Sequence, residues 1–198
     1  MKTLISLLKE TKKEKLFLFA CLLAACIACS KNQGTPATAS IFTGMDVKDS
    51  TLNDNKGAIE LGLKFQSSLA GIVNGVKFYK TTGNVGIHTG ELYSATGDLL
   101  ASKVFTDETA IGWQVVMFDQ PVAITANTTY IAAYHSSLGW YTCTDYAMLT
   151  PVVHAPLIAL ANDPESPNGI YKYTHIPAMP DTTYLADNYW IDVIVTPK

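Results

Sequence analysis

The chain has 198 residues, a formal net charge of −3 and 48% hydrophobic residues, a composition typical of a folded, mildly acidic protein. All 14 basic residues are lysines, so the chain has no arginine for bidentate contacts to phosphates or guanines. Because there is no basic excess to attract a phosphate backbone, we expect no nucleic-acid partner.

The first 25 residues are typical of a bacterial lipoprotein signal peptide. Five lysines give a positively charged start, and residues 16–25 form an apolar run that is too short to cross a bilayer. The run ends in Leu-Ala-Ala-Cys, the pattern of a lipobox, which predicts lipidation of Cys26, with Cys29 as the alternative. Acyl chains on this cysteine would anchor the protein stably in a membrane. We therefore expect a lipid-anchored protein of the bacterial cell envelope, on the outer membrane or the cell surface.

Residues 26–40 are predicted to be a lipidated flexible tether, since they are small and polar and include a proline. Residues 41–198 are long enough for one domain. Cys143 is the only cysteine in that domain, so the fold must depend on its apolar core rather than on a disulfide. The alternative is a thiolate pair of Cys143 with His135 or His154, but a small hydrophobic cysteine is the commoner case.

The first part of the domain contains the clearest strand pattern. Ile41-Phe42 is a candidate short strand, and a turn-rich acidic loop follows it. Residues 58–80 then alternate apolar and polar side chains on both sides of a Ser/Gly break, with the two-residue period of half-buried strands. We interpret them as two strands joined by a short turn, an antiparallel pair whose apolar face a second sheet must cover. In the second strand the alternation places four side chains on one face: Ile72, Asn74, Val76 and Phe78.

Further strands are predicted with turn signals between them, at residues 88–94, 99–106, 113–118, 128–135, 169–175 and 189–196. In the last of these, one face carries Tyr189, Ile191, Val193 and Val195. No convincing helical period occurs. The pattern predicts an all-β fold, a two-sheet antiparallel β-sandwich of jelly-roll or immunoglobulin-like type. The regular succession of strands and turns stops at residues 139–168. These residues are predicted to be one long aromatic-rich loop with at most one weak strand.

Five motifs occur in order along the domain: IELGLKF with GIVNGVKFYK, GIHTGELYSATGDLLA, GWQVVMFDQPVAI with NTTYIAAYH, NGIYKY, and NYWIDVIV. Together they resemble the bacterial extracellular family called domain of unknown function 4082, from about Ala58 onward. The resemblance implies a β-sandwich module that often accompanies secreted carbohydrate-active or adhesive proteins, and it brings no catalytic residues with it. In contrast to multidomain members, we expect this chain to carry a single module behind its lipobox.

Aromatic and histidine side chains near predicted loops and strand ends are the candidate ligand-binding residues: Trp140, Tyr141, His135, Tyr146 and His88. Exposed aromatic rings stack on the apolar face of a pyranose, and neighbouring polar groups hold its hydroxyls. We therefore expect a carbohydrate-binding surface. The alternative is that these rings pack the long loop onto the sheet, in a structural or protein-interaction module for adhesion or scaffolding.

Catalytic and metal-binding patterns are weak. The chain has neither a G-x-S-x-G nucleophile elbow nor a glycine-rich phosphate loop, so we expect no enzymatic activity. Its four histidines are far apart, without the close pairs of zinc sites, and we expect no metal centre and no cofactor. Calcium in the Asp46–Asn55 loop is a weak option, because that loop offers oxygen ligands without the spacing of an EF-hand.

Overall fold

The computed structural model describes residues 37–47 and 51–198, so the predicted signal peptide and both candidate lipidation sites lie outside the described residues. Residues 37–198 form one compact unit. All the regular structure that is described is β-strand, and the predicted all-β fold is confirmed. The described part of the chain contains no helix long and apolar enough to cross a membrane.

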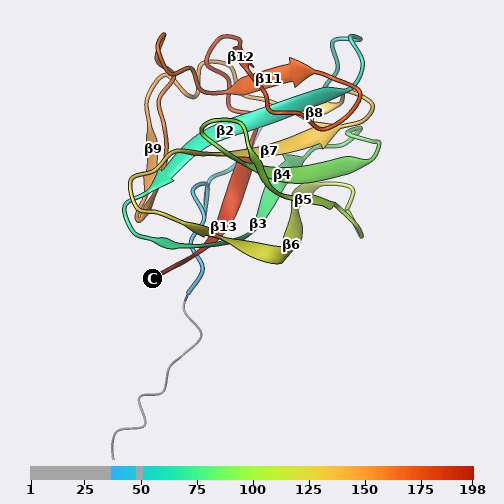
Figure 1. Ribbon diagram of the computed structural model, residues 1–198. Coiled ribbons are helices and arrows are strands. Elements are labelled where there is room, and N and C mark those ends of the chain that lie inside the picture. Colours follow the sequence, from blue (N-terminus) through green and yellow to red (C-terminus); the bar gives the residue numbers. More distant parts are fainter. Residues whose placement is uncertain (1–36, 48–50) are drawn as a thin grey trace, which may run out of the picture. The chain divides into compact units, whose positions relative to one another are not determined.

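Two main antiparallel sheets face each other across the core (Figure 1). The larger sheet has the order β12 (Thr182–Thr183), β11 (Ile170–Tyr173), β2 (Ile59–Ser67), β7 (Tyr130–Ser136), β4 (His88–Ser94) and β5 (Leu99–Val104). In this sheet β10 (Leu157–Ala159) also pairs with β2 and with β9 (Val152–His154). The smaller sheet has the order β13 (Ile191–Pro197), β3 (Gly71–Lys80) and β6 (Gly112–Ile124). A separate short pair joins β1 (Thr51–Leu52) to β8 (Tyr141–Thr142). The prediction of an antiparallel β-sandwich is therefore confirmed.

The predicted hairpin of β2 and β3 is wrong, although both strands exist. β2 pairs with β7, β10 and β11, whereas β3 pairs with β13 and β6 in the opposite sheet. The link between them, residues 68–70, crosses from one sheet to the other. Alternation alone does not distinguish the two arrangements, because each strand buries one face in the same core whether or not the two pair.

A β-bulge in β3 changes which of its residues face the core. The register against β6 shifts between Val73 and Gly75, so Val73 and Val76 are both buried and the simple alternation fails there. Ile72, which the alternation placed on the face of Val76, is only half-buried. Gly75 is required at the bulge, since a Cβ on this residue would lie 2.1 Å from the Val116 carbonyl oxygen.

Ile41 and Phe42 are buried in a turn, not in the predicted strand. Their backbone N–H groups donate to the two carboxylate oxygens of Asp192 on β13, at 2.7 and 2.9 Å. The Lys77 ammonium lies 3.2 Å from the same carboxylate. A buried carboxylate therefore satisfies the amides that a neighbouring strand would otherwise satisfy. Just before this turn, Ala39 exchanges backbone hydrogen bonds with Val195.

The long segment of residues 139–168 contains three short strands, β8, β9 and β10, where the sequence predicted at most one. The other predicted strands are confirmed, with ends that differ by a few residues. The face of the last strand is also correct, since Tyr189, Ile191, Val193 and Val195 all belong to the core. The three short strands were missed because each pairs over only two or three residues, which is too short for a periodic pattern.

Candidate functional site

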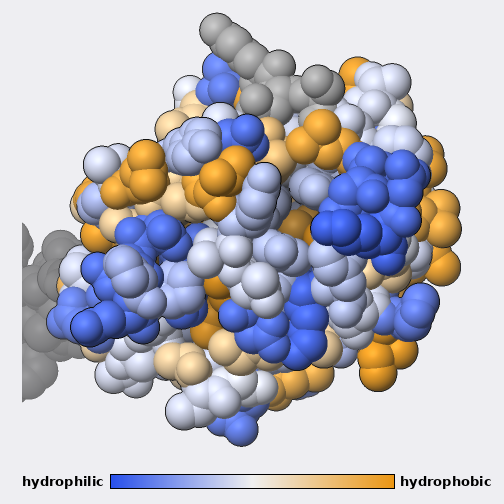
Figure 2. Space-filling view, turned by 90° about the horizontal axis from the view of Figure 1, so that it is seen from above, coloured by the Kyte–Doolittle hydropathy of each residue, from blue (hydrophilic) through white to orange (hydrophobic). Residues whose placement is uncertain are grey.

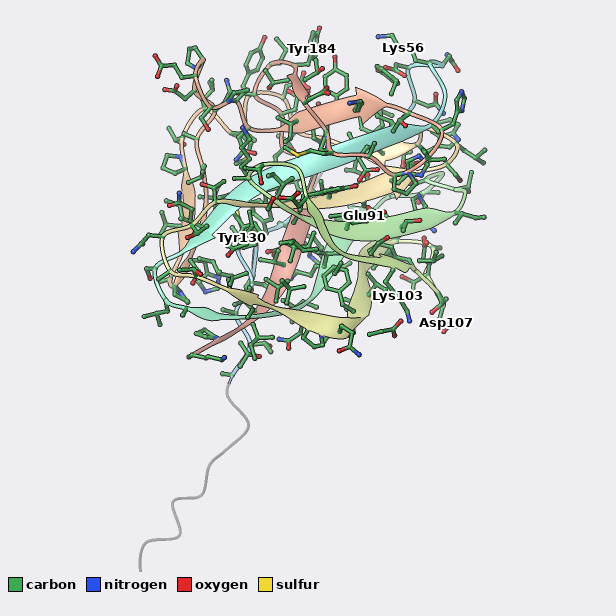
Figure 3. All side chains as sticks on the ribbon, viewed as in Figure 1. Lys56, Glu91, Lys103, Asp107, Tyr130 and Tyr184 are labelled. Carbon is green, nitrogen blue, oxygen red and sulfur yellow. The ribbon has the colours of Figure 1, made fainter. Side chains whose placement is uncertain are left out.

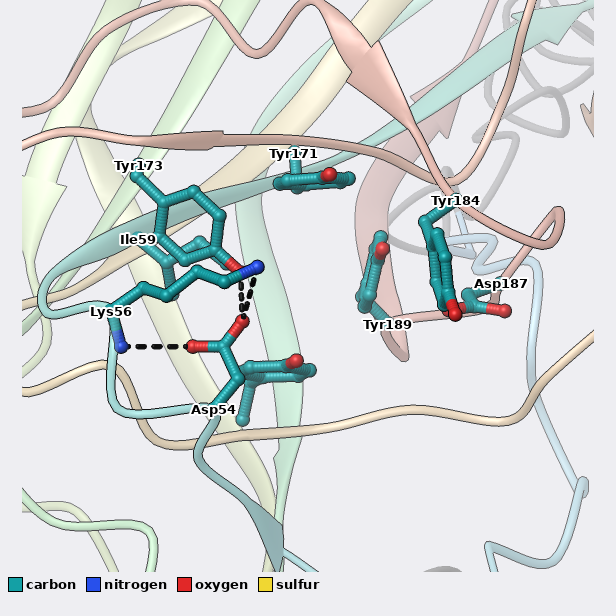
Figure 4. Close-up of a pocket in the computed structure, with 9 residues that line it drawn as sticks. Asp54, Lys56, Ile59, Tyr171, Tyr173, Tyr184, Asp187 and Tyr189 are labelled. Carbon is teal, nitrogen blue, oxygen red and sulfur yellow. Dashed lines mark hydrogen bonds and ion pairs between the residues drawn. The ribbon is translucent and has the colours of Figure 1, made fainter.

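A pocket lined by tyrosines lies at the end of the molecule formed by β11 and the segment after β12. Strands β11 and β12 are uppermost in Figure 1. Viewed onto this end, hydrophilic and hydrophobic residues are intermixed on the surface (Figure 2). Lys56 and Tyr184 both lie at this end (Figure 3). They belong to the lining of a pocket with a volume of about 300 Å³. Its walls, shown in Figure 4, are Asp54, Lys56, Ile59, Tyr141, Tyr171, Tyr173, Tyr184, Asp187 and Tyr189. We call this site the tyrosine pocket.

Strand β11 supplies two of the tyrosines. It pairs with β2 so that Tyr171 lies opposite Leu61 and Tyr173 lies opposite Ile59. Residues two apart on a strand share a face, and both tyrosines therefore point to the same side of the sheet as these core residues. Their ring centroids are 5.5 Å apart, in an edge-to-face arrangement.

The short β1–β8 pair brings the next residues to the pocket. It sets Leu52 opposite Tyr141, so the loop that follows β1 carries Asp54 and Lys56 to the same end of the sandwich. Asp54 accepts a hydrogen bond from the Tyr173 hydroxyl, and its other oxygen accepts the backbone N–H of Lys56. The Lys56 ammonium lies 3.7 Å from Asp54 and 5.0 Å from the centroid of the Tyr173 ring. This end of the pocket therefore carries an ion pair against an aromatic ring.

The segment between β12 and β13 forms the opposite end, where Figure 4 shows Tyr184, Tyr189 and Asp187. The Tyr189 ring packs edge-on against Tyr141, with centroids 5.9 Å apart. Burial and, to a lesser extent, the nearby Asp145 carboxylate raise the pKa of Asp187 to about 6, against the lowering effect of the Tyr146 backbone N–H. The Asp187 carboxyl therefore loses its proton as the pH rises through about 6.

The hydroxyls of Tyr141 and Tyr189 remain protonated under ordinary conditions. Burial raises the pKa of Tyr141, with an added contribution from the charge of Asp54. Burial likewise raises the pKa of Tyr189, with an added contribution from the charge of Asp187. The pocket consequently combines flat rings and O–H donors with carboxylate acceptors and one ammonium donor, a set that can hold an uncharged polyhydroxylated molecule.

Only one of the five residues predicted from the sequence lines this pocket, and that residue is Tyr141. Tyr146 is exposed and Trp140 is half-buried, but neither belongs to the pocket lining. The structure therefore brings one of the five predicted residues, Tyr141, to the tyrosine pocket.

The two histidines that were predicted to bind a ligand are buried, and their ring nitrogens contact other groups of the protein. His88 Nδ1 lies 2.9 Å from the Glu108 carboxylate, and its Nε2 lies 2.9 Å from the side-chain oxygen of Asn84. His135 Nε2 lies 3.0 Å from the Thr174 carbonyl oxygen. Both histidines thus stabilise strand and loop packing.

Sequence reasoning missed four pocket tyrosines: Tyr171, Tyr173, Tyr184 and Tyr189. A usable signal existed for the first two, because the Y-x-Y spacing in a predicted strand places both rings on one face. No local pattern marks the other two. They flank a stretch in which Leu185 and Ala186 adopt left-handed backbone conformations, with φ of 51° and 55°. The direction of such a stretch does not follow from residue type.

The proposed calcium loop has other contacts in the structure. Asn53 accepts the backbone N–H of Asn55 through its side-chain oxygen, and Asp54 faces Tyr173 and Lys56 in the pocket wall. In that loop, residues 48–50 lie outside the described part of the chain. These contacts assign Asp54 to the pocket rather than to an open cluster of oxygen ligands.

The sequence model of the family described as domain of unknown function (DUF4082) matches residues 45–191. This span includes all nine residues that line the tyrosine pocket. No curated protein matches the chain.

Proposed function

The chain belongs to the domain of unknown function 4082 family, and we propose that this β-sandwich binds carbohydrate, without transforming it, in the tyrosine pocket. One observation carries the proposal: five tyrosine rings surround a pocket that has a carboxylate at each end and an ammonium at one. Rings of this kind can stack on the apolar face of a pyranose, while the carboxylates accept hydrogen bonds from its hydroxyls.

The size of the pocket favours a short saccharide. Its volume of about 300 Å³ lies at the lower end of the range for small-molecule sites, which is roughly 300–1,000 Å³. A mono- or disaccharide unit, or the end of a longer glycan, is therefore the ligand class that we propose.

A role in binding rather than in hydrolysis is favoured by the contacts of the two carboxylates. Glycoside hydrolysis needs two carboxyl groups that flank one bond, one of them free to donate a proton. Asp54 is instead engaged by the Tyr173 hydroxyl and by Lys56, and Figure 4 shows Asp187 at the other end of the pocket. We accordingly propose a lectin-like module with no catalytic residues.

We also propose that lipidation of Cys26, or alternatively of Cys29, holds this module on the bacterial envelope. The lipobox pattern supports this location. Incorporation of labelled fatty acid into the expressed full chain tests it. Loss of label in Cys26→Ser with retention in Cys29→Ser would assign Cys26, and the reverse would assign Cys29. Labelling that persists in the double variant would contradict the anchor.

A second candidate function, protein interaction on a surface assembly, is favoured by a different part of the fold. β6 is an edge strand of the smaller sheet, and its outward side chains Val115 and Met117 are 49% and 50% exposed. Exposed apolar side chains on a strand edge are suited to contacts with another chain. This candidate predicts that Met117→Lys abolishes partner capture, whereas a pocket variant leaves it intact.

A glycan-array screen tests the carbohydrate proposal. The probe is the compact unit of residues 37–198, applied in calcium and in chelator, beside the same unit carrying Tyr184→Ala. Tyr184 is 60% exposed, so its truncation changes the pocket without removing a core residue. Saturable binding that Tyr184→Ala abolishes would support the proposal. No binding to any glycan in either condition would contradict it and would favour the protein-interaction candidate.

A further inference from the structure

We propose that Cys143, Asp145 and Asp187 form a binding site for a divalent cation of the zinc class. One ligand atom of each residue, a thiol sulfur and two carboxylate oxygens, lies within 4.8 Å of the other two. The Cys143 Sγ lies 3.9 Å from Asp145 Oδ1. In a tetrahedral zinc site, sulfur and oxygen ligands would be about 3.5 Å apart, so Cys143 and Asp145 need to approach by only a few tenths of an ångström.

The backbone holds the three residues in place from two distant parts of the chain. Thr144 and Asn188 exchange a pair of backbone hydrogen bonds, each 2.9 Å long, between the segment with Cys143 and Asp145 and the segment with Asp187. Next to this pair, the Tyr146 backbone N–H donates to the Leu185 carbonyl oxygen at 3.1 Å. The Trp190 indole N–H also donates to the Thr144 hydroxyl at 2.9 Å. The two segments are therefore joined directly beside the proposed ligands, which reduces the cost of ordering them around an ion.

A buried carboxylate oxygen gives independent support for a ligand here. Asp187 is only 3% exposed, and its Oδ1 has no hydrogen-bond partner among the described residues. Leaving a buried carboxylate oxygen unpaired is costly, and the neighbouring Asp145 carboxylate adds repulsion between like charges. A divalent cation between the two carboxylates would remove both penalties.

The chemistry of the three ligands selects the class of ion. Calcium and magnesium prefer oxygen ligands alone, whereas a thiolate with two carboxylates suits zinc or cadmium. Three protein ligands would leave a fourth position for water. Asp145 is exposed, which gives an ion access from solvent, and Asp187 also lines the tyrosine pocket. The proposal departs from the expectation of no metal, because that expectation depended on histidine pairs and on ligands close together in the sequence.

The test uses the metals alone and is independent of any glycan. The compact unit of residues 37–198 has Cys143 as its single cysteine, so ultraviolet absorption from a cadmium–thiolate bond reports on this site only. Zinc affinity is measured by calorimetry in the wild type and in Cys143→Ser, Asp145→Asn and Asp187→Asn. Asp119→Asn removes an exposed carboxylate that lies on β6 and does not belong to the cluster, and it serves as the matched control. Circular dichroism without metal checks that each variant is folded.

We expect one equivalent of zinc, a cadmium–thiolate band that Cys143→Ser abolishes, and affinity at least tenfold weaker in Asp145→Asn and Asp187→Asn. Asp119→Asn should bind as the wild type does. The exposed position of Asp145 keeps the test valid even if Asp187→Asn does not fold. Absence of saturable zinc and cadmium binding would overturn the proposal, and so would zinc affinity unchanged in Asp145→Asn. Neither result bears on glycan binding, because no glycan is present.

Discussion

Glu60 and Glu91 are both fully buried and lie against each other on the outer face of the larger sheet, on the two strands that flank β7. The segment after β11 covers them, and the Ala178 backbone N–H lies 3.4 Å from Glu60 Oε2. Burial raises the pKa of Glu60 to about 8, opposed in part by the Ala178 backbone N–H. Burial and the adjacent Glu60 raise the pKa of Glu91 to about 11. The pair is therefore an uncharged carboxylic acid pair at neutral pH.

This pair predicts a loss of stability with rising pH. Its folded-state pKa values lie above the unfolded value of about 4.5, so its contribution is complete below that pH and is lost progressively as the pH rises toward 8 and beyond. We expect the free energy of unfolding to fall by on the order of 1 kcal/mol per pH unit for a group of this kind. Urea denaturation between pH 5 and 9 measures this slope.

Glu60→Gln should flatten that pH dependence, because the amide remains neutral throughout. Glu165→Gln is the matched control, since Glu165 is exposed. A wild-type slope that equals the slope of Glu60→Gln would show that the buried pair does not titrate as we infer.

A second prediction concerns the buried carboxylate of Asp192, which accepts the backbone N–H groups of Ile41 and Phe42 and pairs with Lys77. Asp192→Ala would leave two amides and an ammonium without their partner. We expect a loss of about 3–5 kcal/mol in the free energy of unfolding. The exposed pair of Lys103 and Asp119 offers a control, since Asp119→Ala should cost less than about 1 kcal/mol. Equal costs in the two variants would contradict the assigned role of Asp192.

A third prediction concerns the bulge at Gly75. A methyl group there would lie 2.1 Å from a backbone oxygen of β6, and a backbone atom moves away less readily than a side chain. We expect Gly75→Ala to destabilise the fold by about 2 kcal/mol or more. Gly83→Ala is the comparison, because no atom lies within 4 Å of its Cβ position and only its φ of +95° is strained, at about 1–2 kcal/mol. Thermal unfolding of both variants measures the difference, and a Gly75→Ala protein as stable as the wild type would refute the close approach.

The sequence was sufficient for the longer strands but not for the short ones or for how the strands pair. The alternation in β2 and β13 correctly identified Leu61 and Val193 as core residues, because side chains on a strand alternate regardless of which strand lies alongside. The same alternation could not show that β2 and β3 belong to opposite sheets. It also could not place the bulge at Gly75, which depends on the register of β6.

The candidate site illustrates the same limit. Tyr141 was predicted to bind a ligand because it is an aromatic residue in a long predicted loop. Tyr171 enters the pocket through its register against Leu61, and Asp54 enters through the pairing of β1 with β8. Both depend on contacts between residues far apart in the chain, which residue type and local spacing do not encode.

The most direct measurement for the central proposal is the dissociation constant of the strongest array glycan for two tyrosine variants. Tyr184 and Tyr146 are similarly exposed, at 60% and 54%, but only Tyr184 lines the tyrosine pocket. If the pocket binds carbohydrate, Tyr184→Ala should weaken binding at least tenfold, which corresponds to about 1.4 kcal/mol, while Tyr146→Ala should bind as the wild type does. Equal affinities in the two variants, or weakening by Tyr146→Ala alone, would contradict the proposal.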